Sequence, residues 1–224
     1  MNINYRNICN CGQLTEFVEE IGFLPLLGMG IEGWSADEQV DEDCRYTKLP
    51  DGGWEWPLWE WKGAVIRESG CAYGKFFFGK AGFVSRKWWA DFCNWRRSRF
   101  PEPVENSVEA MMLATLQEHG SMISRELRAA CGFTGTKMRS RFDSFITRLE
   151  MSGYIVTEDF VYPHDRHGEQ YGWGWSLLTT PERLLGRDAC RTVRSPEESY
   201  SHLTRHLRKI LPDVTDADIT RVLG

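Results

Sequence analysis

The chain has 224 residues, of which 42 % are hydrophobic and 26 % are charged, and its formal net charge is −5. These values are typical of a globular protein with a substantial core, and no apolar run approaches the roughly 20 residues of a transmembrane helix. The first residues lack a basic start followed by an apolar stretch. We therefore expect no signal peptide, no membrane association and a cytoplasmic location.

Charge is distributed unevenly along the chain. Residues 1–60 carry twelve acidic and three basic residues, whereas residues 61–99 carry two acidic and nine basic ones. The overall acidity speaks against a uniformly basic nucleic-acid binder, but it permits a local positive surface in the middle of the chain. The alternative is that these basic residues simply pair with the acidic N-terminal quarter.

The seven cysteines are scattered, and Cys9 and Cys11 form the one close pair. A zinc site needs further ligands at a recognisable spacing, and none follows. We expect free thiols in a reducing compartment. The sequence therefore predicts neither a metal nor a cofactor.

The first elements are short. Apolar residues at helical spacing predict a helix over 13–21, and Ser35 with Glu38 has the pattern of a capping box. Residues 41–53 are acidic and rich in glycine, which indicates a loop.

Residues 54–89 hold six of the ten tryptophans. Pro57 divides the first four, residues 65–66 and 72–78 have strand composition, and a hairpin is predicted to turn near 79–80. A helix is predicted over 86–98. Three roles are open for these rings: they form the hydrophobic core, they line a groove for nucleic acid, or they line a pocket for a small molecule. We favour core, with Trp56 and Trp59 buried against helix 86–98 because large rings bury much apolar area.

From residue 105 the pattern changes to three predicted helices and a hairpin. The helices span 106–120, 124–131 and 136–151, and the strands 154–162 and 171–178. This order is typical of a winged helix. The expected fold class is α+β and mostly helical. We expect an aromatic-rich N-terminal domain over 1–100, a winged helix over 101–187 and a helical extension over 188–224.

The third of these helices predicts a DNA-binding face. At about 100° per residue, its basic residues lie together, apart from the apolar face and from Asp143 and Glu150. The alternative is an ordinary solvated surface. The candidate DNA contacts are Lys137, Arg141, Ser144 and Arg148 on this helix, Arg166 at the tip of the wing, and Lys75, Lys80, Arg86, Arg96 and Arg97 in the basic part of the N-terminal domain.

Four stretches together resemble a known family: "WPLWEWKG…CAYGKFFFGKAGFVSRKWWADFCNWRR", "SRELRAACGF", "RSRFDSFITRLEMSGYIV" and "GEQYGWGWSLLTTPERL". They are similar to uncharacterised bacterial proteins described as AlkZ-related, over roughly residues 13–187. The resemblance implies kinship with winged-helix DNA glycosylases that excise alkylated bases, and hence a protein that faces DNA.

The resemblance also implies a catalytic motif, Gln-x-Gln or Gln-x-Asp, that handles the attacking water. Gln39 and Asp41 match its letters, but they lie in an acidic stretch without the apolar neighbours of the enzymes' motif. They are weak catalytic candidates, as is Glu60 among the tryptophans. The predicted function is DNA binding through a winged helix, in base-damage repair, with double-stranded DNA as partner. The alternatives are a metal-independent DNA glycosylase, and a protein-interaction or small-ligand module without DNA contact.

Overall fold

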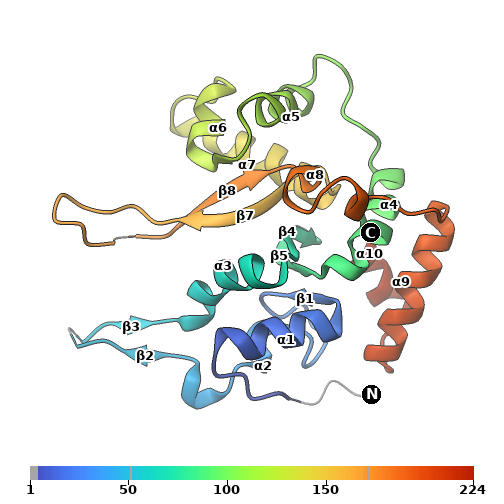
Figure 1. The fold of residues 1–224 in the computed structure, drawn as a ribbon, viewed down its shortest axis with the longest axis horizontal. Coiled ribbons are helices and arrows are strands. Elements are labelled where there is room, and N and C mark those ends of the chain that lie inside the picture. The colour runs from blue at the N-terminus through green and yellow to red at the C-terminus, as the bar shows by residue number, and fades with distance from the viewer. Residues whose placement is uncertain (1–4, 51, 171) are drawn as a thin grey trace.

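The computed structural model describes residues 5–50, 52–170 and 172–224. Within them, six strands form one antiparallel sheet in the order β1-β5-β4-β7-β8-β6, and a two-stranded arm projects from the body (Figure 1). The sheet strands are β1 (Phe23–Pro25), β4 (Ala72–Phe77), β5 (Lys80–Val84), β6 (Met122–Ile123), β7 (Val156–Val161) and β8 (Trp175–Thr179), and the arm consists of β2 (Thr47–Lys48) and β3 (Trp54–Glu55).

Helices surround this sheet, so the expected α+β class is confirmed. They are α1 (Cys11–Ile21), α2 (Ala36–Gln39), α3 (Pro57–Ser69), α4 (Arg86–Arg99), α5 (Val108–His119), α6 (Ser124–Ala130), α7 (Thr136–Met151), α8 (Pro181–Leu184), α9 (Pro196–Ile210) and α10 (Asp216–Leu223), with the short 3₁₀ turns η1 (Glu42–Cys44) and η2 (Asp188–Cys190).

Local sequence signals explain most element boundaries. The Ser35 hydroxyl accepts the backbone N–H of Glu38 at the start of α2, as the capping pattern predicts. The hairpin β4–β5 turns at Phe78 and Gly79, where the backbone enters the left-handed region. Residues 65–66 were expected to be extended, and this is wrong: they lie in α3. Pro57 starts that helix and Gly70, with φ 61°, ends it.

Two hydrophobic cores lie on this frame. The larger core joins α1, α3, α4 and strands β1, β4 and β5, and the C-terminal helices contribute Leu203, Leu207 and Val222 to it. The smaller core joins α5, α6 and α7, with Met112, Phe142 and Leu149 at its centre. One register pair, Tyr73 with Thr157, links β4 to β7 and makes the sheet continuous between the two cores.

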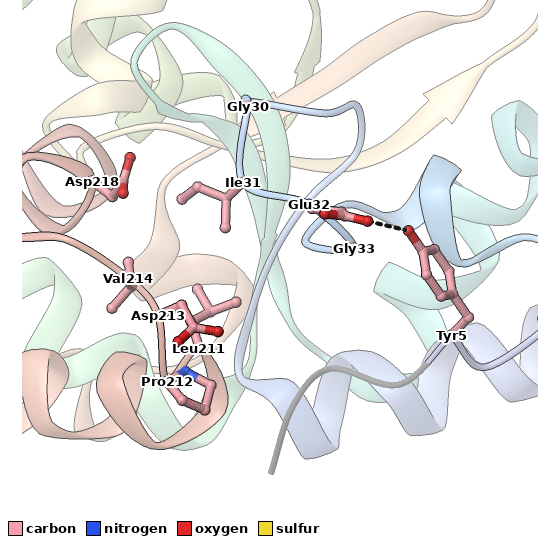
Figure 2. A pocket seen from close by; sticks show the side chains of 10 residues that line it. All are labelled: Tyr5, Gly30, Ile31, Glu32, Gly33, Leu211, Pro212, Asp213, Val214 and Asp218. Carbon is pink, nitrogen blue, oxygen red and sulfur yellow. Dashed lines mark hydrogen bonds between the residues drawn. The ribbon is translucent and has the colours of Figure 1, made fainter.

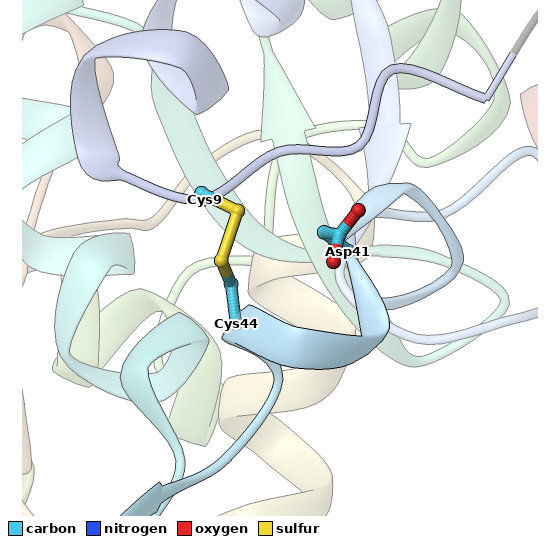
Figure 3. Close-up of side chains that lie close together, drawn as sticks. All are labelled: Cys9, Asp41 and Cys44. Carbon is cyan, nitrogen blue, oxygen red and sulfur yellow. A yellow bond between two sulfur atoms is a disulfide. The ribbon is translucent and has the colours of Figure 1, made fainter.

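A disulfide between Cys9 and Cys44 corrects the expectation that all seven cysteines are free thiols. Two backbone hydrogen bonds bring the segments together, from the Ile8 N–H to the Gln39 carbonyl at 2.8 Å and from the Asp41 N–H to the Ile8 carbonyl at 3.0 Å. Asp41 lies beside the two sulfur atoms (Figure 3). Both thiols are used by the disulfide, so this cluster does not offer thiolate ligands to a metal.

Among the described residues, none of the helices has the length and apolar composition that a bilayer span requires.

Candidate nucleic-acid interface

Helix α7 carries three exposed cations in its N-terminal half, Lys137, Arg139 and Arg141, and of these Lys137 and Arg141 belong to the predicted basic stripe. Neither of these two makes a hydrogen bond or an ion pair with the described part of the chain. The opposite face buries Phe142, Ile146 and Leu149 in the smaller core, as the helical period predicts. That burial fixes the rotation of the helix and turns Lys137 and Arg141 toward solvent.

The other two candidates on α7 are partly occupied. The Arg148 guanidinium lies 2.9 Å from the Glu109 carboxylate of α5, so the basic stripe is not free of acids once the neighbouring helix is considered. The Ser144 hydroxyl donates to the Ser140 carbonyl at 2.9 Å. An exposed ion pair of this kind adds little to the stability of the fold, so Arg148 can leave Glu109 and bind a phosphate instead. Lys137 and Arg141 have no such ion pair to break.

Glu150 lies apart from the basic stripe of α7, as its helical angle predicts. Its side chain is buried against β4, because α7 packs on that strand as well as on its own core. Burial raises the pKa of Glu150 to about 7, although Lys75 opposes this shift from 4.0 Å. Lys75 also donates to the Thr147 hydroxyl at 3.0 Å. Lys75 therefore fastens α7 to the sheet and is not a free contact for DNA.

Two arginines at the end of α4 also point inward. Arg96 is fully buried, and its guanidinium donates to the carbonyls of Phe76 at 2.7 Å and Val222 at 2.9 Å. Arg97 binds the Glu182 carboxylate at 2.6 Å and the Gly153 carbonyl at 2.8 Å. The prediction that Arg96 contacts DNA is wrong, since the side chain has no exposed surface, and Arg97 is committed to α8 and to the start of β7.

The remaining basic candidates stay on the surface. Lys80 reaches the Gly28 carbonyl at 3.2 Å, and Arg86 is exposed at the start of α4. Arg166, on the long β7–β8 connection, donates to the His167 ring at 3.0 Å. The structure thus leaves surface cations on three separate elements and does not gather the predicted set into one cluster.

Gln39 and Asp41 are structural. Gln39 is buried, its amide N–H donates to the Gly33 carbonyl at 2.6 Å, and its oxygen accepts the Arg6 N–H at 2.8 Å. Asp41 accepts the Asp43 N–H at 2.9 Å at the start of η1. Both side chains hold loops of the N-terminal region, and this agrees with a chance match to the Gln-x-Asp letters.

The tryptophans divide into buried and half-buried rings. Trp88 and Trp89 of α4 are buried with Phe76 and Phe92, as a core requires. Trp56 and Trp59 are only half-buried. Their rings stack on each other with centroids 5.7 Å apart, and Trp59 meets Trp173 of the β7–β8 connection edge-on at 5.1 Å. Both rings pack at the edge of the larger core, but they are not largely buried as expected, and their recorded ring contacts are with each other and with Trp173 and not with α4.

Lys62 lies beneath these rings and was missed by the sequence interpretation. Its side chain is fully buried, with Nζ 3.1 Å from the centroid of the Trp59 ring and 4.1 Å from that of Phe160. Burial lowers the pKa of Lys62 to about 7, and nearby Glu60 opposes this only partly. We call Trp56, Trp59, Lys62, Phe160 and Trp173 the aromatic box. The sequence does contain a signal for this contact, because Lys62 follows Trp59 by about one helical turn and therefore lies on the same side of a helix.

Three donors of the aromatic box have no acceptor among the described residues: the Lys62 amine and the indole N–H groups of Trp56 and Trp59. Buried polar groups in proteins are nearly always hydrogen-bonded, so three orphans in one cluster need an explanation. Glu60, the third catalytic candidate, lies at the exposed rim, where its carboxylate accepts the Tyr162 hydroxyl.

A cavity of about 370 Å³ lies elsewhere, between the loop around Gly30 and the α9–α10 connection (Figure 2). Its polar side chains are mostly acidic, and Tyr5 donates to Glu32 at its edge at 3.5 Å. The acids that line it are Glu32, Asp213 and Asp218. An acidic wall repels phosphate, so this cavity does not serve a nucleic acid.

The architecture is that of an α+β protein with helices around one antiparallel sheet. The sequence model of the family described as AlkZ related matches residues 8–224, so the chain belongs to the AlkZ-related family. The DNA glycosylase AlkZ of Streptomyces sahachiroi is a similar solved structure, with 9 % sequence identity and a TM-score of 0.49. The match covers 94 % of this chain and 58 % of that one. No curated protein matches the chain. The family assignment rests on the sequence match.

Proposed function

We propose that residues 101–187 form a winged-helix unit that binds duplex DNA, and that the protein acts in the repair of damaged bases. The order α5, β6, α6, α7, β7, β8 supports the first part, because three helices followed by a hairpin build a winged helix. The unit has its own core, which favours the boundary near residue 101. Membership of the AlkZ-related family supports the second part.

The observation that carries the proposal is the unpaired state of Lys137 and Arg141 on α7. In a winged helix this third helix enters the major groove, where side chains of its exposed face meet phosphates and base edges. A cation without an intramolecular partner forms such a contact without first breaking another one. The net charge of −5 does not oppose this, because the phosphate field acts on the local surface.

Three basic candidates of the N-terminal region, Lys75, Arg96 and Arg97, are held within the protein. We therefore place the DNA-facing surface on α7, the β7–β8 connection and the aromatic box beside that connection, with Lys80 and Arg86 exposed outside it. The C-terminal helices pack on α4 and brace the larger core. We therefore assign residues 188–224 a supporting role.

The test compares duplex binding of the wild-type chain with that of Lys137→Ala/Arg141→Ala at several salt concentrations. The variant is expected to bind more weakly, and its log–log salt slope is expected to fall by about 0.9 for each phosphate that the variant no longer neutralises. The matched control is Arg205→Ala/Lys209→Ala on α9, which removes the same charge from exposed positions of the supporting helix. Equal affinity and slope in the wild-type chain and the α7 variant would remove α7 from the interface.

A second arm uses the same duplex with and without an alkylated purine. Tighter binding to the damaged duplex supports the repair assignment. Equal binding to both duplexes contradicts recognition of alkylation damage and leaves the winged-helix DNA contact in place.

A further inference from the structure

The aromatic box combines features that a DNA contact alone does not need. Lys62 is an amine enclosed by rings, without a carboxylate or carbonyl bonded to it in the part of the chain that the structure describes. A lysine amine normally remains in water or joins an ion pair. Here the indole ring of Trp59 and the ring of Phe160 replace the hydration shell of the amine.

The backbone around Lys62 is arranged to bring β7 close to α3. Gly63 faces that strand, and a Cβ atom at this position would lie 3.0 Å from Asp159 Oδ1 and 3.6 Å from the Phe160 ring. The missing side chain therefore leaves room beside α3 for Asp159, and with it for the strand β7 that also carries Phe160. The adjacent Arg67–Asp159 ion pair, at 2.5 Å, joins α3 to β7 at the solvent-exposed surface beside the box.

We propose that the Lys62 amine forms a Schiff base with the aldehyde of a ring-opened abasic deoxyribose in DNA, inside the aromatic box. This inference rests on the proposed function for access to DNA and goes beyond it by assigning an activity. An unprotonated lysine amine in an apolar pocket is the nucleophile used for carbonyl substrates. The two indole donors suit the hydroxyl or phosphate oxygens of the same sugar.

The reaction balances without a further reactant. The amine nitrogen adds to the aldehyde carbon, one proton from the amine and one from solvent turn the carbonyl oxygen into water, and water leaves as the C=N bond of a protonated iminium forms. The resulting iminium acidifies the C2′ hydrogen. Loss of that proton to solvent forms a C=C bond and expels the 3′ phosphate with its electron pair, so the strand breaks at the abasic site.

The charged and titratable groups around Lys62 are compatible with a neutral amine. Glu60 on α3 is the group whose charge favours the ammonium form, and its carboxylate is already bonded to the Tyr162 hydroxyl. Asp159 of β7 is paired with Arg67. The pKa of Lys62, about 7, leaves a large neutral fraction at neutral pH, whereas an ordinary lysine has a pKa near 10.4.

The outer cover of the box is its removable part. Trp173 is 70 % exposed, belongs to the long β7–β8 connection, and touches Trp59 edge-on. In a winged helix this connection meets the nucleic acid, so DNA contact and displacement of the cover occur at the same place. Trp173→Ala is therefore expected to make the amine more accessible.

The main experiment traps the imine with sodium borohydride. The full chain is incubated with a labelled duplex that contains one abasic site, and the reduced protein–DNA adduct is detected on a denaturing gel and located by peptide mass mapping. We expect an adduct on Lys62 in the wild-type chain and none in Lys62→Met, which keeps the volume of the side chain. The matched control is Lys87→Met on α4, an exposed lysine whose Nζ lies 5.6 Å from the Trp88 ring centroid.

The pH profile separates a reactive amine from an incidental one. Adduct formation at Lys62 is expected to level off above pH 7, because the pKa of its amine is lowered to about 7. A small aldehyde, 2-deoxyribose 5-phosphate, repeats the trapping without duplex binding. Its reaction with Lys62 is expected to be faster in Trp173→Ala than in the wild-type chain.

The outcomes distinguish the two proposals. A bound abasic duplex without an adduct on Lys62 overturns this inference and leaves the proposed function standing. Failure of any duplex to bind overturns the proposed function. In that case the small aldehyde decides whether Lys62 is reactive. Trapping of 2-deoxyribose 5-phosphate on Lys62 with the expected pH profile supports the inference. No trapping on Lys62, or trapping equal to that on Lys87, overturns the inference. Circular dichroism of Lys62→Met verifies that the variant is folded.

Discussion

The start of α3 and the body of α4 come from one tryptophan-rich stretch, yet they form two different kinds of aromatic region. Around α4 the rings are closed: Trp89 and Phe92 have no exposed surface, and the cation among them, Arg96, donates to two carbonyls. Around the start of α3 the rings are open to one side, and the cation beneath them, Lys62, has no hydrogen-bond acceptor in the described chain.

The difference shows how to interpret a buried cation. Arg96 joins the strand β4 to the C-terminal helix α10, and both partners are backbone carbonyls that the fold places in advance. Two hydrogen bonds therefore offset much of the cost of its burial, although its Nε has no acceptor among the described residues. The Lys62 amine has no hydrogen-bond acceptor in the described chain and contacts only the faces of two rings. A buried charged group that destabilises the fold and makes no stabilising hydrogen bond is a candidate for a functional role.

The largest expected effect separates the two sets of rings. Trp89→Ala is expected to lower the free energy of unfolding by about 3–5 kcal/mol, because it empties a filled site in the core. Trp56→Ala is expected to cost roughly half as much, since a half-buried ring loses less buried area. Urea unfolding of both variants measures this. Equal losses would show that the aromatic box is as much a part of the core as α4.

A somewhat smaller effect is expected for Arg96. Arg96→Met keeps much of the side-chain volume but leaves the Phe76 and Val222 carbonyls without their donor, at a cost of roughly 3 kcal/mol. The control is Arg99→Met, at an exposed position one turn later on α4, where a change within about 0.5 kcal/mol is expected. If both variants unfold at the same urea concentration as the wild-type chain, the two carbonyl contacts do not anchor α10.

A further effect has the opposite sign and depends on pH. The pKa of Lys62 is lowered to about 7 in the folded chain, so between pH 10 and pH 7 the unfolded chain binds more protons at this residue. Stability must therefore fall as the pH falls through this window and level off below pH 7. Each pH unit is worth at most about 1.4 kcal/mol.

Lys62→Met removes this penalty. The variant is expected to gain stability over the wild-type chain at pH 7, and the gain is expected to shrink toward pH 10. Urea unfolding at both pH values, with Lys87→Met as the exposed control, measures the difference. A gain that does not change with pH would mean that the Lys62 amine keeps an ordinary pKa.

Much of the fold follows from local sequence signals. Capping residues, Pro57, the turn at Gly79 and the apolar periods of α1, α7 and α9 act over one or two helical turns, so the elements can be predicted without knowledge of their neighbours. The exposed position of Lys137 and Arg141 can also be predicted from the local sequence. It depends on the rotation of α7, and the buried stripe of that helix determines the rotation.

For the other charged residues, contacts between distant segments of the chain determine whether the side chain is buried and which groups it binds. Helical angle alone places Glu150 outside the apolar face of α7, but β4 packs on that side and buries it beside Lys75. Arg96 has the sequence context of a basic helix end, and its carbonyl acceptors come from residues 20 and 126 positions away. Cys9 and Cys44 form a disulfide because two backbone hydrogen bonds align their segments.

The aromatic box is the clearest case of a site that only the tertiary structure decided. Trp56, Trp59 and Lys62 follow each other at helical spacing, and this much is determined by the sequence. Phe160 and Trp173 arrive from the β7–β8 hairpin because Gly63 lets β7 approach α3. Whether a lysine stays hydrated or loses its water depends on such distant partners, because desolvation is a property of the whole surrounding volume and not of the local chain.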